Sequence, residues 1–139
     1  MNDSHLKEKY MEYQFLMQQL QQLQQNISAL EKHILDLNNL YENLSYLNQS
    51  KVESEVLMPL GSGIFLKGEL KDNKSVIMNV GNNVCVEKNI DEAKNTINKQ
   101  LEEVINVLEQ LKEEINNTTE KLSVLQTEFE NMKQKKLSE

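Results

Sequence analysis

The chain has 139 residues, enough for one domain with an elongated part and too few for a large multidomain enzyme. Only 38% of the residues are hydrophobic and there is no tryptophan, which excludes a thick globular core. The net charge is −7 and all fifteen basic residues are lysines, so nucleic acid is a poor partner. One cysteine, Cys85, and the lack of a long continuous apolar segment favour a cytoplasmic protein without an internal disulfide.

The first third of the chain has the heptad repeat of a coiled-coil helix, predicted over residues 5–48. Its apolar residues follow one another at alternating steps of four and three residues. The line of contact, or seam, that these steps predict contains Leu6, Tyr10, Tyr13, Met17, Leu20, Leu23, Ile27, Leu30, Ile34, Leu37, Tyr41 and Leu44. Two successive steps of three, from Met17 to Leu20 to Leu23, predict a local overwinding of the supercoil.

The last third repeats this pattern and predicts a second coiled-coil helix over residues 90–136. Asn89 followed by Glu92 is a capping-box pair at its start, and three lysines after residue 132 suit its C-terminal end. Its predicted seam contains Ile90, Ala93, Ile97, Leu101, Val104, Leu108, Leu111, Ile115, Thr118, Leu122, Leu125, Phe129 and Met132. Two successive steps of four around Leu101 indicate a stutter.

Residues 53–88 contain all four glycines and the single proline, together with many β-branched residues. They predict strands at 55–60, 64–70, 75–80 and 84–87, joined by short turns as two β-hairpins. We therefore expect an α+β fold, with a long antiparallel coiled-coil hairpin that carries two β-hairpins at its head. So few strand residues cannot bury a core of their own, so these hairpins are expected to join an intersubunit β-barrel.

The residues of this middle region resemble the alpha-subunit family of archaeal prefoldins. The resemblance rests on 56–68 (VLMPLGSGIFLKG), 76–81 (VIMNVG) and 86–88 (VEK), and the order of elements agrees over the whole chain. It implies one prefoldin-like domain over 1–139 in a hexamer of two alpha and four beta subunits. It also implies an ATP-independent holdase, which binds non-native client proteins at the coil tips and delivers them to a group II chaperonin.

Client binding requires accessible apolar side chains near the chain ends. With Leu6 at heptad position d, the sequence places Met11, Phe15 and Leu16 outside the seam, and Leu137 likewise. Phe129 and Met132 lie on the seam close to the helix end. The predicted client-binding tip is Leu6, Tyr10, Met11, Tyr13, Phe15, Leu16, Phe129, Met132 and Leu137.

Alternating apolar residues in the hairpins predict a second surface, for subunit assembly. Those residues are Val56, Met58, Leu60, Ile64, Leu66, Leu70, Val76, Met78, Val80, Val84 and Val86. The alternative from another class is a structural subunit of the gamma-prefoldin kind, whose hairpins would form filaments.

Covalent chemistry and cofactors are not expected. His5 and His33 have no partner at metal-ligand spacing, and Cys85 has no evident base. A strand, and no helix, follows Gly61 and Gly63, which disfavours a phosphate-binding loop. The sequence thus predicts no catalytic, cofactor or metal residues, and a role as a helical arm of an enzyme is disfavoured.

Overall fold

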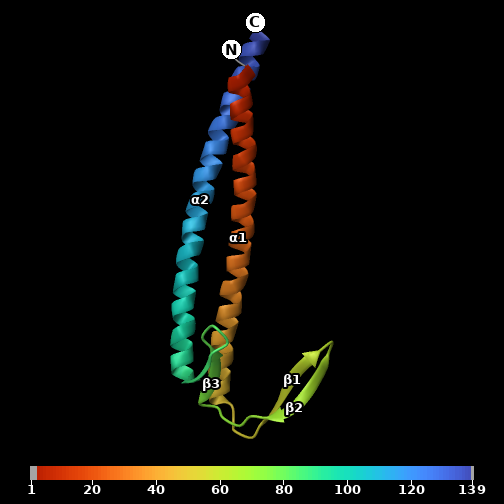
Figure 1. Ribbon diagram of the computed structural model, residues 1–139, viewed down its shortest axis with the longest axis vertical. Coiled ribbons are helices and arrows are strands. Elements are labelled where there is room, and N and C mark those ends of the chain that lie inside the picture. Colours follow the sequence, from red (N-terminus) through yellow and green to blue (C-terminus); the bar gives the residue numbers. More distant parts are fainter. Residues whose placement is uncertain (1–2, 139) are drawn as a thin grey trace. The chain divides into compact units, whose positions relative to one another are not determined.

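A computed structural model describes residues 3–138 as two long helices with four short strands between them (Figure 1). The elements in chain order are α1 (Asp3–Gln49), β1 (Glu55–Gly61), β2 (Ile64–Glu69), β3 (Ser75–Asn79), β4 (Cys85–Asn89) and α2 (Ile90–Ser138). The predicted pair of helices and pair of hairpins are confirmed. Three of the four helix ends lie one or two residues beyond the predicted limits, and α2 starts at the predicted residue.

The chain divides into two compact units. The terminal unit contains residues 3–33 and 104–138, and the hairpin unit contains residues 34–103. In the terminal unit the first part of α1 lies antiparallel to the last part of α2, so that both ends of the described chain lie at one end of this unit (Figure 1). The hairpin unit contains the remaining helical segments and both β-hairpins.

The start of α2 is fixed by its own sequence. The side-chain oxygen of Asn89 accepts a hydrogen bond of 2.8 Å from the backbone N–H of Glu92, as the capping pattern predicts. Asp91 and Glu92 lie in the first turn and Lys135 and Lys136 in the last, where each sign of charge complements the helix dipole.

The seam of α1 differs from the predicted one near its start. Leu16 is buried with 6% of its surface exposed, whereas Met17 is 44% exposed and lies outside the seam. The step from Tyr13 therefore goes to Leu16 and then to Leu20, which keeps three and four in regular alternation. The predicted overwinding is wrong, since the repeat runs without interruption from Tyr13 to Leu44.

Lys9 takes the seam position that was predicted for Tyr10. It lies four residues before Tyr13, is half-buried, and forms an ion pair of 2.6 Å with Glu128 of α2. The aliphatic part of a lysine can line an apolar contact while its ammonium group reaches a partner at the edge. Tyr10 lies beside this position and is 57% exposed.

The seam of α2 agrees with the predicted one at every position. All thirteen predicted residues are buried or half-buried, and the most enclosed are Ala93 at 1%, with Ile90 and Ile97 at 3% each. In the hairpin unit these three residues are buried alongside Leu37 and Leu44 of α1. The side-chain nitrogen of Lys94 lies 5.4 Å from the ring centre of Tyr41, a cation–π contact between the two helices.

The strands form two separate antiparallel sheets, β1 with β2 and β3 with β4. In the first, Val56 pairs with Gly68 and Met58 with Leu66, before a bulge near the turn. Gly61 and Gly63 both have positive φ angles, 128° and 80°, as their predicted role in the turn requires.

All four strands differ from the predicted ones by one or two residues at an end. Leu70 and Val80 follow β2 and β3, and Val84 precedes β4, so all three lie just outside the observed strands. Each still makes a backbone hydrogen bond: Leu70 N–H donates to Ser54 O at 2.9 Å, and Val80 N–H donates to Val84 O at 2.9 Å. These bonds continue the hairpin pairing at the point where the strands leave regular geometry.

The corrected register is testable by substitution in the seam. Leu16→Ala should lower the free energy of unfolding by about 2 kcal/mol, because it removes a buried side chain from the helix contact. Met17→Ala should change it by less than about 0.5 kcal/mol, because that side chain is largely exposed. Urea unfolding followed by circular dichroism measures both, and a larger effect for Met17→Ala would contradict the observed seam.

Candidate client-binding and assembly surfaces

Five of the nine predicted tip residues have side chains largely open to solvent in the terminal unit. Met11 is 67% exposed, Phe15 66% and Leu137 84%. Leu6 and Tyr10 are exposed to a smaller extent, at 40% and 57%. Accessible apolar groups of this size are what a client-binding surface requires.

Leu16 corrects the predicted tip. It was expected to point away from the helix contact, but it is buried with Leu122 and Leu125 of α2 in the core of the terminal unit. The physical reason is that Leu16 continues the alternation of three and four between Tyr13 and Leu20, both of which stay on the seam. Leu16 therefore stabilises the helix pair and presents little surface to a client.

An aromatic cluster lies beside this core. The ring of Phe129 lies 6.0 Å from that of Tyr10 and 5.9 Å from that of Tyr13, both measured between ring centres. The side-chain amide of Gln126 donates a hydrogen bond of 3.3 Å to the Tyr13 hydroxyl. Phe129, Tyr13 and Met132 are half-buried. These rings thus join the two helices while part of their surface stays accessible.

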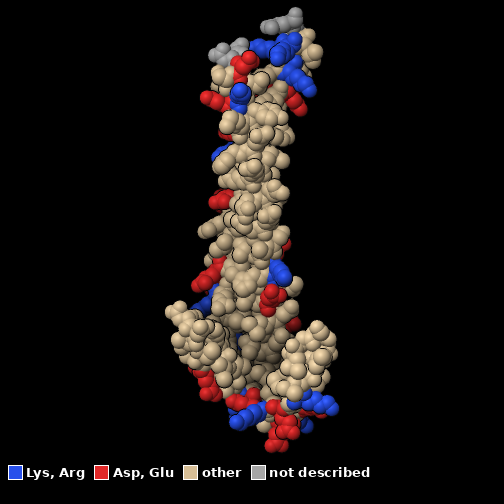
Figure 2. Space-filling view, turned by 45° about the vertical axis from the view of Figure 1, so that its right-hand side comes forward, with Lys and Arg blue, Asp and Glu red and all other residues tan. Residues whose placement is uncertain are grey.

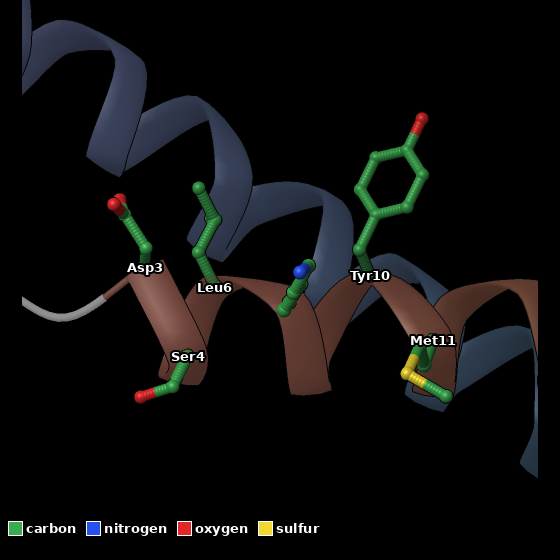
Figure 3. A pocket seen from close by; sticks show the side chains of 6 residues that line it. Asp3, Ser4, Leu6, Tyr10 and Met11 are labelled. Atoms are coloured by element: carbon green, nitrogen blue, oxygen red, sulfur yellow. The ribbon is translucent and has the colours of Figure 1, made fainter.

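A surface pocket follows the outer end of α1. Figure 3 shows Leu6 and Tyr10 projecting from one side of the helix and Ser4 and Met11 from the other. Its lining also includes Asp3 and Lys7, and most of its surface is apolar. Leu6, Tyr10 and Met11 all border this open pocket.

The first hairpin carries apolar residues on both faces. The predicted face contains Val56, Met58 and Leu66, and a Cβ on residue 68 would lie 3.0 Å from the terminal carbon of Met58. Gly68 therefore leaves room for the Met58 side chain across the strand. Leu60 and Ile64, near the turn, are 67% and 62% exposed.

The opposite face of this hairpin was missed by the sequence analysis. Leu57 and Phe65 lie there and are 59% and 55% exposed. Both are apolar residues in the strands, and they could have been found by reading each strand for both of its faces. The first hairpin therefore offers two apolar faces to partners.

The second hairpin has one apolar face. Val76, Met78 and Val86 are half-buried, and Met78 pairs directly with Val86. On the other face Ile77 is 76% exposed, among polar neighbours such as Ser75 and Glu87. Cys85 is exposed as well.

The turn before β3 is held by Asp72. Its carboxylate accepts hydrogen bonds from the Ser75 hydroxyl and from the backbone N–H of Lys74, the latter at 2.8 Å. The hydrogen bond from Ser75 is the main cause that lowers the pKa of Asp72 below its ordinary value, and the hydrogen bond from Lys74 is the second cause. The Ser75 hydroxyl also lies 2.9 Å from a carboxylate oxygen of Glu87 on β4, so it links the turn to the hairpin.

The described residues contain neither a membrane-spanning helix nor a cluster of metal ligands. Neither helix within residues 3–138 has the apolar length that a membrane crossing requires. Over the same residues, no three histidine, cysteine or acidic side chains are grouped as metal ligands.

Two long helices joined through two β-hairpins define a coiled-coil class of fold. A sequence model described as "Prefoldin subunit" matches residues 16–135. The prefoldin subunit alpha of Pyrococcus horikoshii is 36% identical over 100 residues, which cover 71% of this chain and 68% of that protein. Prefoldin subunit alpha 1 of Thermococcus kodakarensis is 35% identical over 95 residues, covering 68% and 65%.

The fold is also found in a solved structure. A chain of the cryo-EM structure of filamentous PFD from Methanocaldococcus jannaschii has a TM-score of 0.74 and 23% sequence identity. The match covers 88% of this chain and 98% of that one.

The chain belongs to the prefoldin family, and the resemblance to its alpha subunits is confirmed. It is a chaperone-type subunit that assembles with other prefoldin subunits. The matched segments span about two thirds of the length of the two relatives named above.

The hydrogen bonds at Asp72 predict how the stability of the folded chain depends on pH. Because its pKa is lowered in the folded chain, this carboxylate contributes stability above its ordinary pKa, and the contribution is lost as the pH falls through the lowered value. Ser75→Ala removes the main cause and should raise the pKa of Asp72 toward the ordinary value. Carbon-13 NMR of the Asp72 carboxyl measures it, and an unchanged titration in Ser75→Ala would contradict the assignment.

Proposed function

We propose that this chain is an alpha-type subunit of an ATP-independent holdase that captures non-native proteins at the exposed tip of its terminal unit. The observation that carries the proposal is the exposure of Met11 and Phe15, 67% and 66%, outside the seam of α1 in the terminal unit. Methionine adapts to partners of different shape, which suits clients that share apolar surface and no fixed motif. The tip then comprises Leu6, Tyr10, Met11, Tyr13, Phe15, Phe129, Met132 and Leu137.

Capture at such a tip depends on several weak contacts. Two or more tips that hold one client can bind it about 10² to 10⁴ times more tightly than one tip does. Each single contact then releases quickly while the client stays bound. No ATP or other cofactor is needed for this mode of action.

The second part of the proposal is a closed assembly of two such chains with four beta-type subunits, joined through shared β-barrels. The exposed apolar residues of the first hairpin support it, because apolar strand surface that faces solvent favours aggregation unless a partner covers it. The assembly would work in the cytoplasm and pass its clients to a group II chaperonin.

A filament is the second candidate. The solved structure reported above, whose fold this chain shares, is described as filamentous. A filament subunit would give a mass that grows with protein concentration, whereas a closed hexamer would keep a fixed mass. Native mass spectrometry of the complex recovered from the source cells separates the two candidates.

The tip assignment predicts the effect of removing its two outward apolar groups. The double substitution Met11→Ser and Phe15→Ser should reduce suppression of client aggregation at least about tenfold, because each copy of this chain in the assembly loses two contacts at its tip. Light scattering of a chemically denatured test protein, diluted into the native assembly, measures this.

The matched control for the tip is Leu35→Ser. Leu35 lies on the same helix, is 59% exposed and belongs to the hairpin unit. Full suppression by the double variant, or equal loss in the Leu35 control, would remove the tip assignment. Native mass of each variant confirms that assembly is intact.

The assembly surface predicts a difference between two neighbouring residues of β3. Met78→Asp should shift the native mass from the assembly to the single chain, because it places a charge on the apolar face of the second hairpin. Ile77→Asp, on the opposite and more polar face, should leave the mass unchanged. Equal masses for the two variants would contradict the assignment of this face to assembly.

A further inference from the structure

The first hairpin is attached to the rest of the hairpin unit by two chain segments, residues 50–54 and 70–74, which we call the junction. Among the described helices and strands, the backbones of β1 and β2 closely approach only each other. No junction residue is buried, and Figure 2 shows charged side chains gathered at the end of the hairpin unit that carries the strands. Because no apolar core fixes the direction of this hairpin, that direction depends on hydrogen bonds within the junction.

Hydrogen bonds close the junction on two sides. At the base of the hairpin, the backbone N–H of Glu53 donates to the carbonyl oxygen of Leu70 at 2.7 Å, and the backbone N–H of Leu70 donates to that of Ser54 at 2.9 Å. Nearer the helices, the side-chain nitrogen of Asn73 donates to the carbonyl oxygen of Ser50 at 2.8 Å. The two segments of the junction are therefore held together both at the hairpin and at the end of α1.

The bond from Asn73 differs from its surroundings in burial. Asn73 and Ser50 are both half-buried, whereas the residues directly before and after each of them are exposed. Ser50 follows the C-terminal end of α1, where the last carbonyl groups of a helix have no partners within it and carry a partial negative charge. A side chain that donates at residue 73 suits this place.

Asn73 extends from a turn that is anchored to the other helix. The carboxylate of Asp72 accepts a hydrogen bond from the backbone N–H of Lys74, which holds the turn. The carbonyl oxygen of Lys74 in turn accepts a bond of 3.1 Å from the backbone N–H of Ile90, the first residue of α2. The bond from Asn73 to Ser50 therefore links a turn fixed at the start of α2 to the end of α1.

We propose that Asn73 is a positioning residue for assembly, whose bond to Ser50 fixes the direction in which the first hairpin meets a partner subunit. This inference rests on the proposed assembly through the hairpins. Without the bond, only the two chain segments and the base of the hairpin limit its direction. Ordering a segment during association costs free energy, so a hairpin that is fixed beforehand assembles more readily.

Two isosteric substitutions test the donor of Asn73. In Asn73→Asp the carboxylate cannot donate to the Ser50 carbonyl and is repelled by the end of the helix. The matched control is Asn89→Asp, because the side chain of Asn89 accepts its hydrogen bond from Glu92 and a carboxylate accepts it as well. Both substitutions add the same negative charge to the hairpin unit.

The first readout is the distance between the two hairpins of one chain. Spin labels on Cys85 and on an added Lys67→Cys, both exposed positions, report it by double electron–electron resonance, with labelled chain diluted in unlabelled chain. The distance distribution should be equally narrow in the chain that carries Asn89→Asp and in the chain that carries neither substitution. It should broaden in Asn73→Asp, and also in Asn73→Ala, which removes the donor without adding a charge.

The second readout is the rate of assembly. Subunits separated from the native complex are mixed again with each variant, and light scattering follows the re-formation of the complex. Asn73→Asp should slow it about fivefold, since the loss of one hydrogen bond lowers the population of the competent direction by about that factor. Asn89→Asp should change the rate by less than about twofold.

The outcomes separate this inference from the assembly on which it rests. Equal widths of the distance distribution in Asn73→Asp and Asn89→Asp overturn the proposal, and so does a broadened distribution with an unchanged rate of assembly. The native mass of Met78→Asp tests the assembly face by itself. If that mass is unaltered while Asn73→Asp broadens the distribution and slows assembly, Asn73 positions the hairpin and the assembly face lies elsewhere.

Discussion

One line of side chains between two helices is the constraint on which the terminal unit depends. Its buried core consists of Leu16, Leu122 and Leu125, with a few half-buried neighbours around them. No large side chain among the described residues is fully buried. A contact this thin leaves most of each helix exposed, so that stability comes from the seam and the remaining surface is available for binding.

Lys9 shows how a charged residue is accommodated in such a thin contact. It takes a seam position, is half-buried and pairs with Glu128 of α2 at 2.6 Å. An ion pair this open to solvent contributes little to stability, so the buried apolar residues decide which side of α1 faces α2. The burial of Leu16 leaves Met17 outside the seam.

The elements of this fold were predictable from local sequence signals. Helix-breaking residues are confined to 59–81, and the heptad pattern extends over both flanking segments. The seam position of Leu16 was also within reach of the sequence, because steps of three and four alternate regularly through Tyr13, Leu16 and Leu20 and break when Met17 is chosen. The contact of Lys9 with Glu128, which lies 119 residues away in the chain, was not predictable, because periodicity carries no information on such a contact.

The hairpins show a different limit of prediction from sequence. Alternation predicted one apolar face correctly for Met58 and Leu66, but Leu57 and Phe65 make the other face apolar too. Apolar residues on both faces suit a hairpin that contacts a partner on each face. The sequence of one chain carries no information on that partner. The same reasoning applies to the client-binding tip, where exposure identifies Met11 and Phe15 but no local signal names what they bind.

A contact this thin also separates stability from surface chemistry. Met11 and Phe15 lie outside the seam, so substitutions there change the exposed surface while leaving the packing of Leu16 and Leu122 in place. In a globular core the two properties share the same side chains and change together. In this chain the exposed apolar surface can therefore change by single substitutions without loss of the helix pair.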